Sequence, residues 1–344
     1  MLAHPRSQEF SQAVIPGFRR RLLAWYDASR RALPWRETRD PYRVWLSEIM
    51  LQQTRVAAVI AHYRDFLRRF PTIEKLAGAH EASVLAAWSG LGYYRRARML
   101  HATAKQVVRD GGFPRTSLKL LDLPGIGRYT AAAIASIAFD EPIAVVDGNV
   151  ERVLERIYGG PLTPKQSWQS AGQLLDARRP GDFNQAMMEL GATVCTPRSP
   201  ACLACPVIEM CATRGELPRE DKPAPQKKRE INFALHCRKS TVFMVRRSFD
   251  ASLMAGMWEL PEIPVNAQGT FENSSPCFTL RHSITVTDYT VRVWRSPAPS
   301  PMNGEWISRS RLERVPLTGL ARKILRKAAI LASPVRPTRL QPPR

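Results

Sequence analysis

The fold of this chain is decided by the stretch Leu121–Thr130, which reads LDLPGIGRYT. Its Leu-Pro-Gly-x-Gly core predicts a tight turn between two helical segments. The glycines at Gly125 and Gly127 let the backbone approach an anion closely, and the helix that follows presents N–H groups at its N-terminus. This combination suits a DNA phosphate, although an ordinary corner between two helices would show the same glycine spacing.

Outward from this turn, the pattern is helical from Phe18 to about Arg214. Apolar residues recur at intervals of three and four, and the connectors between these runs contain Gly or Pro. The stretch 217–229 is rich in Pro and Lys and predicts an extended linker. The first two thirds of the chain should therefore form a helical domain.

After the linker the pattern changes to short β-type runs. They are Ile231–Cys237, Thr241–Arg246, Phe278–Thr285 and Tyr289–Trp294, and an amphipathic helix is expected over Leu317–Leu331. Cys237 and Cys277 are expected to be small buried apolar residues. The last dozen residues are polar and rich in Pro and Arg, and we expect them to be disordered.

The net charge of the chain indicates which class of molecule it binds. Its 344 residues contain 51 Lys and Arg against 30 Asp and Glu, a formal charge of +21. Such an excess favours a polyanion, with nucleic acid first and a membrane surface second. No apolar run is long enough to cross a membrane, and the N-terminus lacks the apolar core of a signal peptide. We therefore expect a cytoplasmic protein with no membrane association.

Four cysteines fall within seventeen residues, in the pattern Cys-x6-Cys-x2-Cys-x5-Cys. In a reducing compartment such a group is typical of a metal site or a cluster, not of disulfides. Structural zinc usually has two Cys-x2-Cys pairs and only one is present, whereas a 4Fe–4S cluster tolerates uneven spacing. The chemistry of the residues alone leaves iron–sulfur and zinc open. The residues are Cys195, Cys202, Cys205 and Cys211.

The cysteine spacing resembles that of the endonuclease III superfamily of DNA glycosylases, in which it ligates one 4Fe–4S cluster. The Leu121–Thr130 stretch is similar to the helix–hairpin–helix motif of the same superfamily. The resemblance places Asp147, in VVDGNV at Val145–Val150, beside the sugar of an extruded nucleotide. Members that also cut the strand carry a lysine where this chain has Tyr129, and a phenol cannot form the imine. The resemblance therefore implies base removal without strand cleavage.

A second acid, Glu48, lies in the otherwise apolar helical stretch VWLSEIML at Val44–Leu51. Burial there would raise its pKa, as a general acid requires, although a carboxylate on a helix face more often lies in water. The stretch resembles the MutY family of adenine glycosylases, in which this glutamate protonates the adenine. The segments Gly90–Arg98 and Asn184–Gly191 extend the resemblance over residues 20–215.

The resemblance assigns further roles by position. Asn149 and Tyr129 would stand near Asp147 and the sugar. Gln53 and Tyr93 would wedge into the duplex and offset the cost of unstacking a base. Trp35, Arg36 and Glu189 would line the adenine pocket.

The β-rich region resembles the Nudix-like domain with which the MutY family recognises 8-oxoguanine, most clearly at Met254–Pro261. The acidic helix of pyrophosphate-cleaving Nudix enzymes is missing, which argues against metal-dependent hydrolysis. In the stretch that begins at Arg281 and His282, the family often has Phe-Ser-His where this chain has Ile284, Thr285 and Val286. His282 and Thr285 are therefore candidate lesion contacts, with weaker recognition expected from the lost histidine.

These observations predict a multidomain protein of α plus α/β class. Residues 1–214 would form an all-α glycosylase domain, with the hairpin at 118–139 and the iron–sulfur module at 195–211. A linker at 215–230 would lead to a small Nudix-like α/β domain at 231–332 and a tail at 333–344. The expected function is that of a monomeric, monofunctional, nucleoid-associated glycosylase in base excision repair. It would remove adenine opposite 8-oxoguanine or guanine in double-stranded DNA. The alternatives are a thymine mismatch glycosylase of the same superfamily and a mismatch-binding protein without catalysis.

Overall fold

The computed structural model describes residues 13–217, 227–251, 253–264, 275–284, 287–298 and 302–332. Tertiary contacts divide the chain into two compact units, which are described separately. The first unit consists of the described residues within Met1–Val56, Thr72–Glu74 and Ala102–Glu220. The second consists of those within Ala57–Pro71, Lys75–His101 and Asp221–Arg344.

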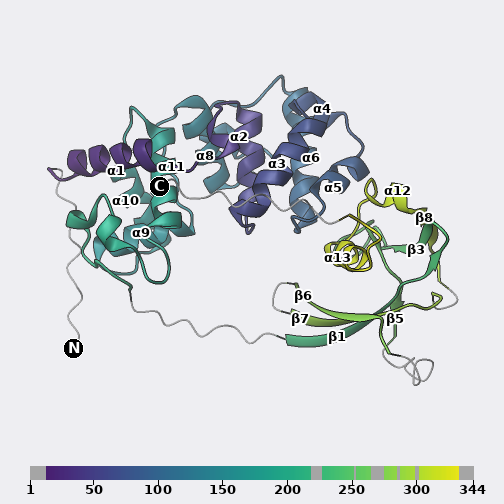
Figure 1. Cartoon of the computed structure of the whole chain (residues 1–344). Coiled ribbons are helices and arrows are strands. Elements are labelled where there is room, and N and C mark those ends of the chain that lie inside the picture. The colour runs from purple at the N-terminus through teal and green to yellow at the C-terminus, as the bar shows by residue number, and fades with distance from the viewer. Residues whose placement is uncertain are drawn as a thin grey trace. The chain divides into compact units, whose positions relative to one another are not determined.

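The chain before residue 212 is helical, as predicted (Figure 1). Its elements are α1 (Ile15–Ser29), η1 (Pro34–Arg36), α2 (Pro41–Leu51), α3 (Val56–Arg69), α4 (Ile73–Ala77), α5 (Glu81–Trp88), α6 (Tyr94–Arg109), α7 (Ser117–Leu120), α8 (Arg128–Phe139), α9 (Gly148–Tyr158), α10 (Pro164–Leu174), α11 (Pro180–Thr193), η2 (Cys202–Ala204) and η3 (Ile208–Met210). Side chains of α1, α9, α10 and α11 form one buried apolar core in the first unit. This core fixes α9 and α11, which carry several of the candidate residues.

The predicted turn between two helices lies between α7 and α8. Gly125 has φ 76°, a left-handed conformation that a residue with a Cβ adopts only with strain. Gly127 is the N-cap of α8, and no heavy atom lies within 4 Å of where its Cβ would stand. The turn therefore leaves the N-terminus of α8 open for close approach by a ligand.

The described residues in the C-terminal part of the second unit form two small sheets and two short helices. The first sheet has the order β5-β1-β7-β6, in which β1 and β7 run parallel and the outer pairs are antiparallel. In the second sheet β3 pairs antiparallel with β2, β4 and β8. Their bounds are β1 (Lys227–Ala234), β2 (Cys237–Arg238), β3 (Thr241–Arg246), β4 (Trp258–Glu259), β5 (Glu262–Ile263), β6 (Phe278–Ile284), β7 (Thr287–Trp294), β8 (Glu305–Ser308), α12 (Arg309–Leu312) and α13 (Gly319–Lys327).

Helix α13 packs its apolar side against these strands (Figure 1). Leu320 and Ile324 are buried in one cluster with Val291 and Val293 of β7. The helix is shorter than the predicted Leu317–Leu331, because Thr318 caps its start by accepting a hydrogen bond from the backbone N–H of Ala321. The predicted mixture of strands and one amphipathic helix is confirmed.

Two details differ from the sequence-based expectations. Strand β1 begins at Lys227, inside the stretch predicted as linker, because Lys227–Ala234 pairs along its whole length with β7. Cys237 and Cys277 are exposed, so the expectation that they are buried is wrong. Both lie at strand ends, where the local pattern gives no sign of whether a neighbouring element covers them. Within the described residues, no helix has both the length and the apolar character that crossing a membrane requires.

Candidate active site

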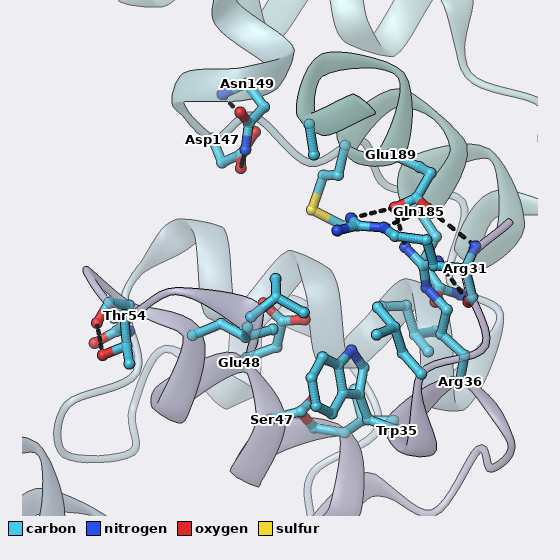
Figure 2. A pocket seen from close by; sticks show the side chains of 18 of the residues that line it. Arg31, Trp35, Arg36, Ser47, Glu48, Thr54, Asp147, Asn149, Gln185 and Glu189 are labelled. Carbon is cyan, nitrogen blue, oxygen red and sulfur yellow. Dashed lines mark hydrogen bonds and ion pairs between the residues drawn. The ribbon is translucent and has the colours of Figure 1, made fainter. Parts of the chain in front are cut away.

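A cavity of about 580 Å³ in the first unit is lined by eight of the thirteen predicted catalytic and DNA-binding residues. It is lined by η1, α2 and α8 and by the facing parts of α9 and α11 (Figure 2). Its polar lining includes Arg31, Trp35, Arg36, Glu48, Gln53, Tyr129, Asp147, Asn149, Gln185 and Glu189. The fold thus brings together residues that are up to 158 positions apart in the sequence.

Glu48 lies near the end of α2, with only 6% of its surface exposed. The hydroxyl of Tyr129, from the first turn of α8, donates to Glu48 Oε2 over 2.7 Å. Burial raises the pKa of Glu48 to about 7, against the lowering effect of this hydrogen bond and with a further rise from the charge of Asp147. Near neutral pH a substantial fraction of Glu48 therefore carries a proton.

Asp147 is the N-cap of α9. Its Oδ1 accepts hydrogen bonds from the backbone N–H groups of Asn149 and Val150, at 3.0 and 2.8 Å. Its Oδ2 accepts from the side-chain amide of Asn149 at 2.8 Å. These three hydrogen bonds fix the orientation of the carboxylate at the N-terminus of α9. Figure 2 shows Asp147 and Asn149 on the opposite side of the cavity from Glu48.

Glu189 forms the third polar centre and is 1% exposed. Its Oε1 accepts from the backbone N–H and Nε of Arg31, and its Oε2 accepts from Nη2 of Arg31 and of Arg36. Burial alone would raise the pKa of Glu189, but these hydrogen bonds outweigh it and hold that pKa at about 2. Four donors fill the four acceptor positions of this carboxylate, so Glu189 fixes the two guanidinium groups.

Arg31 was not among the residues predicted from the sequence. It contributes three of the four hydrogen bonds to Glu189 and lines the cavity. The only local signal was its place in the basic run Arg30-Arg31, five residues before Arg36. Nothing in the sequence pairs it with a glutamate 158 positions later.

The remaining predicted residues lie outside or at the edge of this cavity. Gln53 lines it directly after α2 and has φ 53°. Tyr93 belongs to the second unit, where it is 49% exposed with φ 48°. His282 lies half-buried on β6 opposite Tyr289, and burial lowers its pKa. Thr285 lies outside the described residues.

The four cysteines of 195–211 form the second candidate site. They are free thiols of intermediate burial, and turns of η2 and η3 set the positions of the last three. Burial, together with the charges of the other three cysteines, raises the pKa of Cys205 to about 11. Such mutual repulsion is expected between thiolates that lie near one another. Among the described residues, no three His, Cys, Asp or Glu side chains are close enough to share one metal ion.

A buried arginine shows that these sulfur atoms suit a thiolate-bound cluster. Arg156 on α9 is 4% exposed, and its Nη1 donates to Cys195 Sγ at 3.2 Å and to the carbonyl of Thr196 at 2.8 Å. Hydrogen bonds to sulfur ligands are typical of 4Fe–4S sites, in which four thiolates hold the cluster. Cys195 and Cys205 also pack against the core of the first unit, so a bound cluster would be attached to that core.

One turn before Arg156, Arg152 connects the two sites. Its Nη2 donates to Asn149 Oδ1 at 3.0 Å, and its Nε donates to the carbonyl of Cys195 at 2.9 Å. Asp147 and the first cysteine are therefore joined through two side chains of α9.

Two parts of the chain match known family models. The family model described as HhH-GPD superfamily base excision DNA repair protein matches residues 46–174. The iron–sulfur binding domain of endonuclease III matches residues 195–211, and the four cysteines fit one 4Fe–4S cluster. A solved thermostable thymine-DNA glycosylase superimposes with TM-score 0.56 at 32% identity, over 60% of this chain and 99% of that chain.

Curated relatives carry one common name. Adenine DNA glycosylase of Rattus norvegicus is 51% identical over 216 residues, which cover 58% of this chain and 42% of the relative. The chain spans about two fifths of the length of the rat and human relatives that it matches. Adenine DNA glycosylase of Schizosaccharomyces pombe is 33% identical over 326 residues, which cover 74% of this chain and 71% of the relative. The chain therefore belongs to the adenine DNA glycosylase family of base excision repair proteins.

Proposed function

We propose that this chain is a monofunctional DNA N-glycosylase that removes adenine mispaired with 8-oxoguanine or guanine. One observation carries the proposal. A buried carboxyl group with a pKa of about 7 and a hydrogen-bonded carboxylate line one cavity of about 580 Å³. Two carboxyl groups whose environments differ in this way are typical of enzymes that cleave glycosidic bonds.

The cavity is suited to a base that has left the stack. Trp35 offers a flat apolar surface, and Arg31 and Arg36 keep donors beyond those used by Glu189. These donors would hold acceptor nitrogens of the adenine ring. Glu189 would act through the two arginines, because their hydrogen bonds already occupy its oxygens.

Glu48 would donate its proton to N7 of the adenine. The base then leaves C1′ as a neutral group, and the sugar develops positive charge. Asp147 would stabilise this oxocarbenium-like state by its fixed negative charge or by transient covalent attack. Water adds to C1′ and leaves an abasic site. Asn149 would hold Asp147 in place, and Tyr129 would hold Glu48.

Strand cleavage is not expected, because Tyr129 stands where an imine-forming lysine would be needed. Because hydrolysis transfers no electrons, the 4Fe–4S cluster would not take part in the reaction. When bound, it would stabilise residues 195–211 as a segment that positions the DNA. The open turn at Gly125–Gly127 and the N-terminus of α8 would hold a phosphate of double-stranded DNA.

The mispair specificity would be divided between the units. Gln53 and Tyr93 would enter the duplex as wedges, and the C-terminal sheets, read as a Nudix-like domain, would bind the base opposite the adenine. His282 and Thr285 are the candidate contacts there. One or two hydrogen bonds would give a preference for 8-oxoguanine of about ten- to hundredfold.

A panel of duplexes tests the proposal. The purified chain is incubated with duplexes containing A opposite 8-oxoguanine, A opposite G, and T opposite G, and abasic sites are revealed with alkali. We expect sites at both adenines and none at thymine, and no activity from the Glu48→Gln, Asp147→Asn double variant. The solved thymine-DNA glycosylase makes thymine removal the second candidate. Cleavage only at T opposite G would replace the proposal with it, and mismatch binding without any abasic site would indicate a non-catalytic binder.

A further inference from the structure

A short loop, Gly90–Tyr93, connects α5 to α6 in the second unit. Gly90, Gly92 and Tyr93 have φ of 110°, 71° and 48°, so Tyr93 adopts a left-handed conformation that is strained for a residue with a Cβ. Its ring is 49% exposed. A strained, exposed tyrosine needs support from its surroundings to keep this position.

Part of the support comes from the flanking helices. The indole Nε1 of Trp88 donates to the carbonyl of Gly92 at 3.1 Å. Arg96 Nη2 donates to the carbonyls of Leu91 and Gly92 at 3.2 and 3.3 Å, and its guanidinium lies 5.4 Å from the centre of the Tyr93 ring. These contacts fix the middle of the loop.

The ends of the loop are held from elsewhere in the chain. Ser89, directly before it, and Tyr94, directly after it, both donate to the carbonyl oxygen of Leu317, each at 3.0 Å. Their hydroxyls also lie 3.2 Å from each other, and Arg322 Nε donates to Ser89 Oγ at 2.8 Å. Ser89 is 6% exposed and Tyr94 4%. A single buried carbonyl thus joins both ends of the loop.

That carbonyl is itself fixed in the C-terminal part of the unit. The backbone of Trp258 in β4 accepts from Thr318 and donates to Pro316, at 2.9 and 2.8 Å. Leu317, between them, is fully buried in the apolar cluster under α13. The position of the Leu317 oxygen is therefore set by β4 and α13, and Leu317 itself lies 223 residues after Tyr94.

From this geometry we infer a second role for the C-terminal region, which rests on the proposed function. The Leu317 clasp, defined as the Leu317 carbonyl with Ser89, Tyr94 and Arg322, positions Tyr93 for entry into the duplex. The C-terminal region thereby assists the extrusion of adenine whichever base lies opposite. Ser89 and Tyr94 are positioning residues, because they act through Tyr93 and do not touch the base.

The test uses the full chain with Tyr94→Phe and with the Ser89→Ala, Tyr94→Phe double variant. Tyr158→Phe is the matched control, because it removes a buried phenol hydroxyl far from the loop in sequence. Single-turnover excision is measured for adenine opposite guanine and for adenine opposite a missing base, where no pair must be broken. Extrusion is followed separately by the fluorescence of 2-aminopurine placed next to the adenine, and thermal unfolding is recorded for each variant.

Loss of both hydrogen bonds to the Leu317 carbonyl and of the one from Arg322 should lower excision opposite guanine by about three- to thirtyfold in the double variant. The loss should be less than threefold opposite a missing base, and the 2-aminopurine signal should fall in parallel. Equal losses on both substrates, or no loss on either, would overturn the inference. If the unmodified chain excises no adenine, the proposed function fails, whereas the 2-aminopurine signal on mismatched DNA still decides whether the clasp supports extrusion.

Discussion

Replacing Glu48 by Gln should lower the rate of adenine excision and raise the free energy of unfolding. The change removes the dissociable proton at nearly constant shape, and the amide oxygen can still accept the 2.7 Å hydrogen bond from Tyr129. General acid catalysis contributes about 10²- to 10⁴-fold, so single-turnover excision opposite guanine should fall by at least about a hundredfold. For the unmodified chain, excision should decline as the pH rises through about 7, the pKa of Glu48.

The same pKa determines the effect on stability. The folded chain raises the pKa of Glu48 from 4.5 to about 7, because burial disfavours the charged form. A group with a raised pKa contributes stability that is fully present below pH 4.5 and is lost as the pH rises through about 7. The difference corresponds to about 3 kcal/mol. Glu48→Gln should therefore unfold with a free energy up to about 3 kcal/mol higher than the unmodified chain at pH 8.5, with little gain at pH 4.5.

Two assays on the same preparations decide the matter. Excision is measured under single turnover from pH 5.5 to 9, and unfolding is followed in urea at pH 4.5 and 8.5. Glu37→Gln is the control, since it makes the same change at an exposed carboxylate next to η1. Excision by Glu48→Gln within fivefold of the unmodified chain, or an equal stability change at both pH values, would refute the assignment of Glu48 as a buried general acid.

Three further predictions concern the other groups. Asp147→Asn should abolish excision while keeping the α9 cap, since an Asn oxygen also accepts from the backbone N–H groups; retained activity would remove Asp147 from the mechanism. Borohydride should trap no stable adduct between the chain and DNA, because Tyr129 cannot form an imine, and a high yield of adduct would show that another lysine takes that role. The purified chain should contain about four irons and show a broad visible absorbance. Cys202→Ser should lose both the iron and the absorbance and become more sensitive to proteolysis within 195–211. Stoichiometric zinc after anaerobic purification would favour a zinc site.

The features that could be predicted from the sequence depend on residues that are close to one another along the chain. The hairpin at 121–130 follows from two glycines at a fixed spacing, and the cysteine group follows from proximity along the chain. Glu48 was found because a carboxylate in an apolar helical stretch is unusual, and the structure shows it buried with a raised pKa. In each case the signal lies within about ten to twenty residues.

The features that were missed depend on long-range packing. Arg31 meets Glu189 only because α1 and α11 pack together, and Arg152 bridges to Cys195 only because α11 ends beside α9. Tertiary contacts also group α5 and the start of α6 with the C-terminal strands, through hydrogen bonds such as Tyr94 to Leu317. No periodicity or motif encodes such pairings. The domain boundaries at 214 and 231 therefore stay predictions.

Under the proposed function, the cavity between Glu48 and Asp147 releases adenine and no other base. The most direct measurement is chromatography with mass detection of the free base after single-turnover incubation with a duplex that contains one A opposite G. We expect free adenine in a one-to-one ratio with abasic sites and with the DNA strand uncut. Abasic sites without free adenine, release of a different base, or no base at all with the cluster fully loaded would contradict it.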